Sequence, residues 1–525
     1  MTPEDLDHIR GGTSRLVLSG MPEEMDALLI SALLRDAASN GGDSIIHIAR
    51  DDSRLAVLEE IIGFFAPEVE VISFPAWDCQ PYDRVSPHAD ICAHRMTVLS
   101  HLASAPAPAA GRVVLTTVNA AAQRVPARSA TGAAVMSIKA GGSLDIEHLT
   151  DYLAANGYSR VGQVMEAGEY SIRGGLIDLF PASLDAPVRL DLFGDEIESM
   201  RQFDPLSQRT TSKIDRLTLV PANEIILTPD SIQRFRAGYV GSFGPVTGDD
   251  PLYEAVVAGR KYQGMEHWLP LFHESLSTLF DYVPGALVTM DHLAEEAYAE
   301  RYEAVRDHYT ARKEAANIGG KFGATPYKPL KPDALYIDPE SWAAALADLR
   351  VRPTTPYGRP EGQDSLDMGG RMGRDFAPER KQENVNIYDA LRDHVKALSK
   401  DGKQIFFASY SAGARDRHKG VFEDHGLTRL TLVESWREAE ALTPGALGMI
   451  VLPFEHGFVT RDMAFITEQD LLGDRLVRKA RRQRKADNFI TESSALSPGD
   501  YVVHIDHGVG RFEDLKTIDV GGAPH

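Results

Sequence analysis

Cysteine is nearly absent from this chain of 525 residues, which contains only Cys79 and Cys92. Two cysteines are too few for a disulfide framework or a cysteine-rich zinc site. A basic excess is also missing, because the formal net charge is −21. Such a chain is not built mainly to coat nucleic acid, although local basic patches remain open. We find neither an apolar run of about 18 residues, as a membrane span needs, nor a secretion signal in the polar residues 1–12. These absences favour an intracellular globular protein with several domains.

A phosphate-binding loop is missing where an α/β nucleotide-binding sheet would carry one, after its first strand. Gly20 is followed by residues 21–24, Met-Pro-Glu-Glu. This stretch offers neither the lysine nor the hydroxyl of G-x-x-x-x-G-K-[ST], and its two carboxylates would repel phosphate. A later apolar strand ends in Asp291, an acid typical of the second nucleotide motif, but His292 follows where a helicase would have glutamate. The pattern predicts a nucleotide-binding fold that has lost its nucleotide site.

Strand and helix patterns alternate in two parts of the chain, which predicts parallel sheets covered by helices and an α/β multidomain fold. In the first part we predict strands at 15–18, 44–49, 112–118 and 285–291 and helices at 23–38, 52–65 and 294–313. In the second we predict helices at 387–398 and 411–425 and strands at 404–409 and 449–452. Residues 353–383 are rich in proline, glycine and charge, and we interpret them as a linker.

Between these parts, residues 168–204 break the alternation with three strand-like runs, at 170–180, 188–193 and 197–203. In the middle run Val188, Leu190 and Leu192 should face one side of a sheet, and Arg189, Asp191 and Phe193 the other. Arginine beside an aromatic side chain is typical of a docking surface. A solvated face with one stray aromatic is the alternative, and the pattern alone favours it.

The exact amino-acid sequence of residues 168–204 is more informative than their pattern of apolar and polar residues. The phrases GEYSIRGGLIDLFP and RLDLFGDEIESMRQFD resemble the UvrA-binding module shared by UvrB and the bacterial transcription-repair coupling factors. UvrB needs a phosphate-binding loop, so its absence favours the coupling factors. Further phrases also resemble that family, namely FPAWDCQPYDRVSPHADICAHRMTVLSHL, GMEHWLPLF, EHGF, DLLGDR and, near the end, SPGDYVVHIDHGVGRF.

The resemblance implies a division into domains. A degenerate UvrB-like domain would be formed by residues 1–139 and 221–350, with a UvrA-binding α+β module at 140–220 inserted between them. A linker at 351–384, a small α/β domain at 385–474 and a basic linker at 475–496 would follow. The chain would end at 497–525 in part of the CarD/Tudor-like barrel that binds RNA polymerase, and we expect the family's motor beyond His525.

The resemblance also implies a function. The family recruits UvrA to RNA polymerase stalled at DNA lesions and displaces the polymerase with an ATP-dependent DNA translocase. By motif match, UvrA would contact Arg173, Arg189 and Phe193, and the β subunit of RNA polymerase would contact Ile518. ATP, magnesium and DNA would belong to the motor, so we expect no catalytic, cofactor or metal residues here. We expect a cytoplasmic protein.

Several alternatives stay open. Residues 504–507, His-Ile-Asp-His, suggest either a metal site or, more in keeping with their spacing, a strand edge and turn. His88, Cys92 and His94 suggest either ligands or a capped helix with Ile91, Val98 and Leu102 inward, which we favour. The basic run 475–485 could contact DNA or polymerase, or form a solvated linker. Two rival functions are a UvrB-like nucleic-acid-dependent ATPase and a CarD-type transcription regulator.

Overall fold

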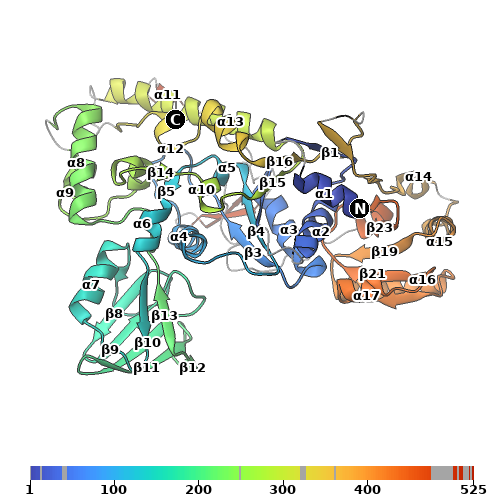
Figure 1. Ribbon diagram of the computed structural model, residues 1–525, viewed down its shortest axis with the longest axis horizontal. Coiled ribbons are helices and arrows are strands. Elements are labelled where there is room, and N and C mark those ends of the chain that lie inside the picture. The colour runs from blue at the N-terminus through green and yellow to red at the C-terminus, as the bar shows by residue number, and fades with distance from the viewer. Residues whose placement is uncertain are drawn as a thin grey trace.

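This computed structural model describes residues 2–11, 15–37, 44–246, 250–319, 327–359, 362, 364–382, 384–473, 501–504, 508–511, 519–520 and 523–524. Figure 1 shows an elongated body with residues 229–257 at one end and residues 377–467 at the other. Residues 136–219 form a separate lobe that projects from one side of this body. The predicted inserted module is therefore a distinct projection of the fold.

A parallel sheet forms the centre of the first domain, in the order β16-β15-β2-β4-β3. Its strands are β2 (Ser44–Ala49), β3 (Glu70–Phe74), β4 (Arg112–Thr117), β15 (Leu287–Met290) and β16 (Arg350–Pro353). Bridges from Arg15 to Val351 and from Leu18 to Thr354 attach β1 (Val17–Ser19) beyond β16. The outermost strand, β17 (Ser365–Asp367), pairs in parallel with β1. The sheet thus combines strands from both flanks of the inserted domain.

Helices cover both faces of this sheet, as the alternating pattern predicts. On one face Ile45, Val113 and Leu287 pack with α2 (Met25–Ala37) and α3 (Asp52–Phe65). On the other face Ile46, Val114 and Val288 pack with helices that include α4 (Ala89–Ser104), α11 (Ala294–Gly319) and α13 (Pro339–Ala347). The helix α3 has the predicted bounds because Asp51 caps its first turn. The short strand β3 was not predicted.

The inserted domain is an antiparallel sheet with one helix against it. The strand order is β12-β11-β10-β9-β8-β7, and only β7 and β8 are parallel. The bounds are β7 (Ser159–Arg160), β8 (Glu169–Arg173), β9 (Leu176–Leu179), β10 (Val188–Phe193), β11 (Glu196–Phe203) and β12 (Thr210–Lys213). Leu149 and Leu153 of α7 (Ile146–Ala155) are fully buried against it. A separate pair, β6 (Met136–Lys139) and β13 (Arg216–Leu219), joins this domain to the first.

The prediction of one strand over 170–180 was wrong, because a hairpin turn divides it into β8 and β9. Gly174 has a φ of +59°, a conformation that favours glycine. A Cβ on Gly175 would lie 2.8 Å from the carbonyl oxygen of Leu192. The strand that approaches Gly175 closely therefore belongs to the same chain.

An aromatic core stabilises the end of the body that lies opposite the small α/β domain. It lies among α8 (Pro229–Phe243), α9 (Pro251–Val257), the 3-10 helix η1 (Met265–Leu271) and α12 (Pro332–Leu335). Phe235 stacks on Phe272 with ring centroids 4.8 Å apart, and both rings are buried. Leu227 packs against this core, and its amide donates to the Ala155 carbonyl of α7 at 2.9 Å and so links this region to the inserted domain.

The small α/β domain has its own mixed sheet, in the order β18-β22-β23-β19-β21-β20. The strands are β18 (Arg371–Met372), β19 (Gln404–Ser409), β20 (Leu430–Leu432), β21 (Leu447–Val451), β22 (Phe458–Val459) and β23 (Met463–Thr467). Its helices include α14 (Ala377–Arg380), α15 (Ile387–Lys400), α16 (Ala412–Asp424), α17 (Trp436–Glu440) and α18 (Glu468–Leu472). The segment 353–383, interpreted as a linker, contains β17, β18 and α14 and so adds strands to two sheets.

The two α/β domains share one hydrophobic core. The ring of Phe65, at the end of α3, lies 4.7 Å from the ring of Trp436 and 6.4 Å from that of Phe465. All three side chains are at least nine-tenths buried. Because apolar burial drives packing, this contact fixes the small domain against α2 and α3.

The last part of the chain is described only in short pairs of strands. β24 (Tyr501–His504) pairs with β25 (Gly508–Arg511), and β26 (Asp519–Val520) with β27 (Ala523–Pro524). His504 ends β24 and pairs with Gly508, whereas the rest of the run 504–507 lies outside the described residues. Ile518 and the basic run 475–485 lie outside the described residues, and the barrel stays a prediction. Among the described helices, none is long and apolar enough to cross a membrane.

Candidate functional site

Asp178 organises the polar face of the inserted domain. It lies on β9 opposite Arg189 of β10, and only 3% of it is exposed. Its carboxylate accepts hydrogen bonds from Nε of Arg189 at 2.6 Å and from a terminal guanidinium nitrogen at 2.9 Å. Arg173 approaches the same carboxylate at 3.4 Å. One buried carboxylate thus orients two guanidinium groups, and with Phe193 these residues form what we call the Asp178 face.

The two arginines of the Asp178 face differ in exposure. The Arg173 side chain is 58% exposed, whereas that of Arg189 is 23% exposed and packs 4.8 Å over the ring of Phe203. The hydrogen bond to Asp178 raises the pKa of Arg189 further above its ordinary value. Arg189 is therefore part of the domain's own structure as well as a contact candidate.

Phe193 is the most exposed large apolar residue of the described chain, at 82%. It ends β10, just before Gly194 with its φ of +63°. The predicted alternation holds for Val188 and Leu190, which are fully buried. A register shift against β11 then follows between Asp191 and Leu192, and Leu192 is only half-buried. An aromatic ring that is largely exposed to solvent and packs in no core is typical of a docking residue.

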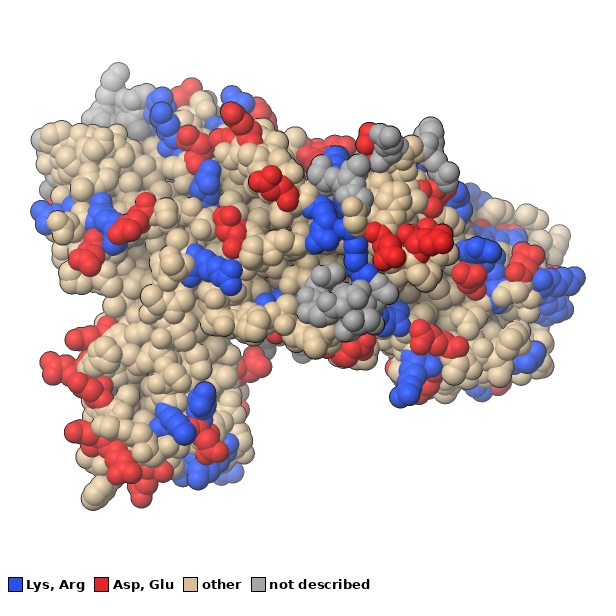
Figure 2. Space-filling view, in the orientation of Figure 1, with Lys and Arg blue, Asp and Glu red and all other residues tan. Residues whose placement is uncertain are grey.

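An open hollow of about 620 Å³ adjoins Arg173 on this face. Asp191 lies in it and binds both the Arg201 guanidinium and the Ser199 hydroxyl, the latter at 2.5 Å. The hollow is lined by Arg173, Gly175, Leu176, Asp191, Leu192, Glu198, Ser199 and Arg201. Figure 2 shows acidic and basic side chains interspersed on the projecting domain, with no single basic patch on the face in view. Such a surface suits a protein partner better than a nucleic acid backbone.

Comparison with protein families assigns this domain and two others. Residues 136–225 match the UvrB interaction domain, residues 398–471 match the D3 domain of MFD, and residues 496–525 match the CarD-like/TRCF RID domain. Among relatives, the transcription-repair-coupling factor of Escherichia coli K12 is 32% identical over 98% of this chain. Over nearly its whole length, this chain is similar to the transcription-repair-coupling factors.

Other transcription-repair-coupling factors align over a similar extent. The factor of Haemophilus influenzae is 29% identical over 96% of the chain, and that of Bacillus subtilis 23% identical over 98%. The alignments cover 43%, 42% and 43% of the Escherichia, Haemophilus and Bacillus relatives. The chain therefore spans about two fifths of the length of the coupling factors that it matches.

The loop after β1, where a nucleotide-binding sheet would hold phosphate, is occupied by the chain itself. The amide of Gly20 donates to the carbonyl of Tyr357 at 3.1 Å, and that of Met21 to Thr355 at 2.9 Å. A Cβ on Gly20 would lie 2.4 Å from the Arg371 guanidinium. The Glu24 carboxylate accepts from the amide of His456 at 3.2 Å. Amides that would face phosphate in an active loop are here bonded to the segment leading into the small domain.

Behind this loop lies a buried group of charges, which we call the Arg54 cluster and which consists of Asp26, His47, Arg54 and Asp291. Nε2 of His47 lies 3.2 Å from Asp291, and Arg54 lies 3.6 Å from Asp291 and 3.4 Å from Asp26. Burial works to raise the pKa of Asp291, but its interaction with His47, the charge of Arg54 and the Arg50 amide hold it below the ordinary range. Burial raises the pKa of Asp26 well above its ordinary value, although Arg54 opposes this.

The other residues considered as metal ligands have structural roles. His88 caps α4, Cys92 is buried within it, and the ring of His94 contacts the carbonyl of Ser73 at 2.7 Å. Val98 and Leu102 are buried as predicted, and Ile91 is half-buried. Within the described residues, the group of metal-ligand type is instead Asp26, His47 and Asp291.

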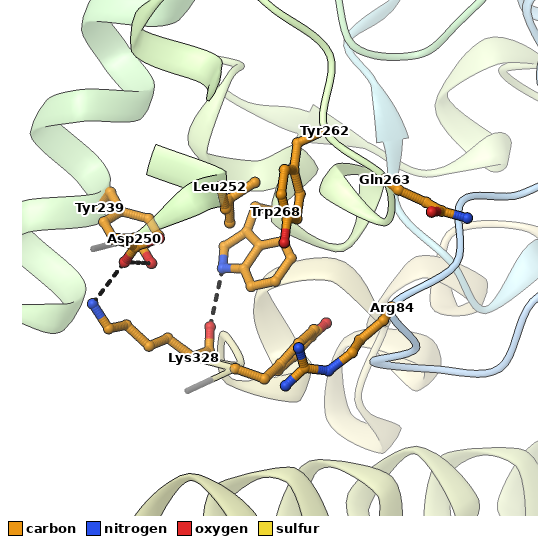
Figure 3. Close-up of a pocket in the computed structure, with 9 residues that line it drawn as sticks. Arg84, Tyr239, Asp250, Leu252, Tyr262, Gln263, Trp268 and Lys328 are labelled. Carbon is orange, nitrogen blue, oxygen red and sulfur yellow. Dashed lines mark hydrogen bonds and ion pairs between the residues drawn. The ribbon is translucent and has the colours of Figure 1, made fainter. Parts of the chain in front are cut away.

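A further cavity of about 280 Å³ lies in the aromatic region of the body, away from the Asp178 face (Figure 3). At one end Asp250 accepts hydrogen bonds from the Tyr239 hydroxyl at 2.7 Å and from Lys328 at 2.9 Å. The indole of Trp268 donates to the Lys328 carbonyl at 3.0 Å. Asp250, Tyr239, Trp268 and Lys328 thus satisfy one another, whereas the buried Tyr327 hydroxyl, which also lines the cavity, has no hydrogen-bond partner among the described residues.

The sequence motif named Arg173, Arg189 and Phe193 as candidates but not Asp178, the residue that orients both arginines. The signal lies in the run Leu176–Leu179, where an acid stands between two apolar residues of a strand. Only the pairing of β9 with β10 shows that this acid lies opposite Arg189. Asp26, His47 and Arg54 were missed for a similar reason, since the fold brings them together from three separate elements.

Proposed function

We propose that this chain recruits the repair protein UvrA through the Asp178 face of its inserted domain. The observation that carries the proposal is the exposure of Phe193 and Arg173 beside a buried carboxylate that fixes Arg189. Exposed aromatic and arginine side chains on a rigid sheet are typical anchors of protein interfaces. The match to the UvrB interaction domain and the resemblance of these residues to the family's UvrA contacts support the same partner.

The wider role that we propose is the coupling of nucleotide-excision repair to RNA polymerase stalled at DNA lesions, in the bacterial cytoplasm. The match of residues 496–525 to the CarD-like/TRCF RID domain supports contact with the polymerase β subunit, where family resemblance assigns Ile518. The family's ATP-dependent DNA translocase, with its ATP, magnesium and DNA, would lie in a motor region. This chain would then supply contacts and not the hydrolysis itself.

Calorimetric titration with purified UvrA tests the first proposal. Each of Arg173→Ala, Arg189→Ala and Phe193→Ala should weaken binding by about 1–4 kcal/mol, because each removes an interface anchor. Leu206→Ala is the matched control for Phe193→Ala, since Leu206 is 80% exposed but lies beyond the opposite end of β11. A folded triple variant with unchanged affinity for UvrA would place the interface elsewhere.

We further propose that the first domain neither binds ATP tightly nor hydrolyses it. The amides of Gly20 and Met21 and the acids that follow them support this, because phosphate would find these amides already bonded and two carboxylates beside them. Equilibrium binding of labelled ATP, with and without DNA, is the test. Micromolar affinity that maps to residues 1–139 would contradict the proposal and favour the UvrB-like ATPase instead.

The polymerase contact is tested separately. Ile518→Asp should weaken binding of this chain to the isolated polymerase β subunit while leaving UvrA affinity unchanged, because the two contacts belong to different domains. A double failure, with neither partner bound by the unaltered chain, would oppose the coupling role as a whole. Binding to promoter DNA instead would favour the CarD-type regulator.

A further inference from the structure

The Arg54 cluster contains three side chains of a metal-binding type that are all hidden from solvent. Asp26 comes from α2, His47 from β2, and Asp291 follows β15. One ligand atom from each lies within 4.8 Å of the other two. The exposed fractions are 2% for Asp26, 0% for His47 and 4% for Asp291. Two carboxylates and an imidazole are a donor set that suits divalent transition metals.

The atoms that face one another in this cluster are poorly satisfied. Oδ1 of Asp26, Nε2 of His47 and Oδ1 of Asp291 have no well-formed hydrogen bond to any described residue, nor does Nε of Arg54. Buried polar atoms without such partners are uncommon in native proteins and call for an explanation. The Arg54 guanidinium lies among these atoms, and one of its nitrogens also donates to the carbonyl of Glu23. The cluster thus holds a cation between two carboxylates, and the directed bond between them is one long hydrogen bond from Arg54 to Oδ2 of Asp26, at 3.4 Å.

The position of the cluster explains why a cation is needed there. Asp291 ends the strand that carries the metal-binding acid in an active nucleotide-binding sheet, and Asp26 lies just after the degenerate phosphate loop. Glu23 and Glu24 add further carboxylates nearby, and Glu24 is buried. Arg50 pairs with Glu23 at the outer side. Without Arg54, two buried carboxylates would lie close together with no permanently charged partner, which destabilises the fold.

We propose that Asp26, His47 and Asp291 form a latent divalent-cation site whose permanent occupant in this protein is the guanidinium of Arg54. The Arg54 side chain supplies the positive charge that a bound metal ion would supply in a nucleotide-binding relative. The proposal rests on the proposed loss of nucleotide binding and states what replaced it. It also predicts that removal of Arg54 turns the cluster into a working metal site.

The test uses the whole chain with Arg54→Ala, dialysed free of metal and titrated with Co²⁺. We expect one Co²⁺ to bind per chain and the bound Co²⁺ to show the visible absorption typical of protein ligands in a low-symmetry arrangement. We also expect a rise in Tm of about 5 °C. The unaltered chain should bind none at the same concentration, because Arg54 fills the site. Arg50→Ala is the matched control, since it removes a more exposed arginine just before α3 and leaves Arg54 in the cluster.

A second variant identifies the ligands. Adding Asp291→Asn to Arg54→Ala should abolish both Co²⁺ uptake and the Tm shift, because a carboxylate is removed from the donor set. If Arg54→Ala does not fold without metal, recovery of folded chain on refolding with Co²⁺ supports the proposal, and no recovery contradicts it. Stoichiometric Co²⁺ binding by the unaltered chain would overturn the role of Arg54. ATP affinity is measured separately, so a failure here leaves the proposed loss of nucleotide binding to its own test.

Discussion

The Arg54 cluster and the Asp178 face both combine arginine with aspartate, but in opposite ratios. In the cluster one guanidinium lies between two carboxylates, and every member is at most 6% exposed. On the face one carboxylate lies between two guanidinium groups, and the arginine side chains are 23% and 58% exposed. The cluster therefore completes its own charge inside the fold, whereas the face keeps positive charge at the surface. The ratio of arginine to aspartate and the burial of these side chains together decide whether the charges are neutralised inside the fold or are left to bind a partner.

The largest effect on stability should come from disrupting the Arg54 cluster. Asp291→Asn leaves Arg54 buried with a weaker partner, so we expect the free energy of unfolding to fall by about 3–5 kcal/mol. Denaturant unfolding followed by circular dichroism measures this. Glu295→Gln is the control, because its pair with Arg15 is 47% exposed on both sides and should contribute less than about 1 kcal/mol. Equal losses in the two variants would remove the contrast that burial is expected to give.

A second experiment separates the two anchors of the Asp178 face. Phe193→Ala should weaken UvrA binding by about 2 kcal/mol and leave the free energy of unfolding within about 0.5 kcal/mol, since the ring contacts solvent. Arg189→Ala should weaken binding and also lower stability by about 1–3 kcal/mol, because Asp178 stays buried without its main partner. Titration calorimetry and denaturant unfolding on both variants decide this. A fully stable Arg189→Ala would mean that Asp178 does not need Arg189.

Salt should act on the face more than on the cluster. The effect of Arg173→Ala on UvrA binding should shrink as ionic strength rises from about 0.1 M to 1 M, because the screening length falls from about 10 Å to 3 Å. The cost of Asp291→Asn should change little over the same range, since buried pairs are poorly screened. Repeating the titration and the unfolding series at both salt concentrations checks the two trends. Equal salt dependence would contradict the division into open and closed sites.

The smallest effect concerns His456, which joins the small domain to the loop before the cluster. A hydrogen bond to Asp470 raises the pKa of His456 to about 9, with help from the charges of Glu24 and Glu455. Since the pKa is above its ordinary value of 6.5, the stabilisation is complete below about pH 6.5 and is lost as pH rises through 9. His456→Asn should therefore cost most stability near pH 6 and almost none near pH 9.5. A pH-independent difference between the variant and the unaltered chain would show that the imidazole charge contributes nothing.

Sequence patterns predicted the elements that depend on local signals. The alternation in β10 placed Val188 and Leu190 in the core, and the helix predicted at 52–65 has the bounds of α3. Patterns failed where long-range contacts decide. The hairpin at Gly174 was merged into one strand, and the proline-rich stretch containing β17 was interpreted as a linker, although β17 forms by pairing with β1. At the candidate site, the motif named Arg173 and Arg189 as candidate contacts. The role of Asp178 could not be predicted, because it depends on the register of β9 against β10.

The interrupted central sheet has a consequence for synthesis. β4 ends at Thr117, but β15, which lies between β2 and β16, begins only at Leu287. At bacterial elongation rates of about 5–20 residues per second, the ribosome needs about 10–30 s to make the residues between them. The inserted domain, whose strands are contiguous in the chain, should therefore fold before its host. We expect ribosome-stalled chains of 270 residues to resist proteolysis within the inserted domain while β2 and β4 are still cleaved; protection of β2 in such chains would contradict this order. A nascent chain would then display its partner-binding face before the sheet that carries it is complete.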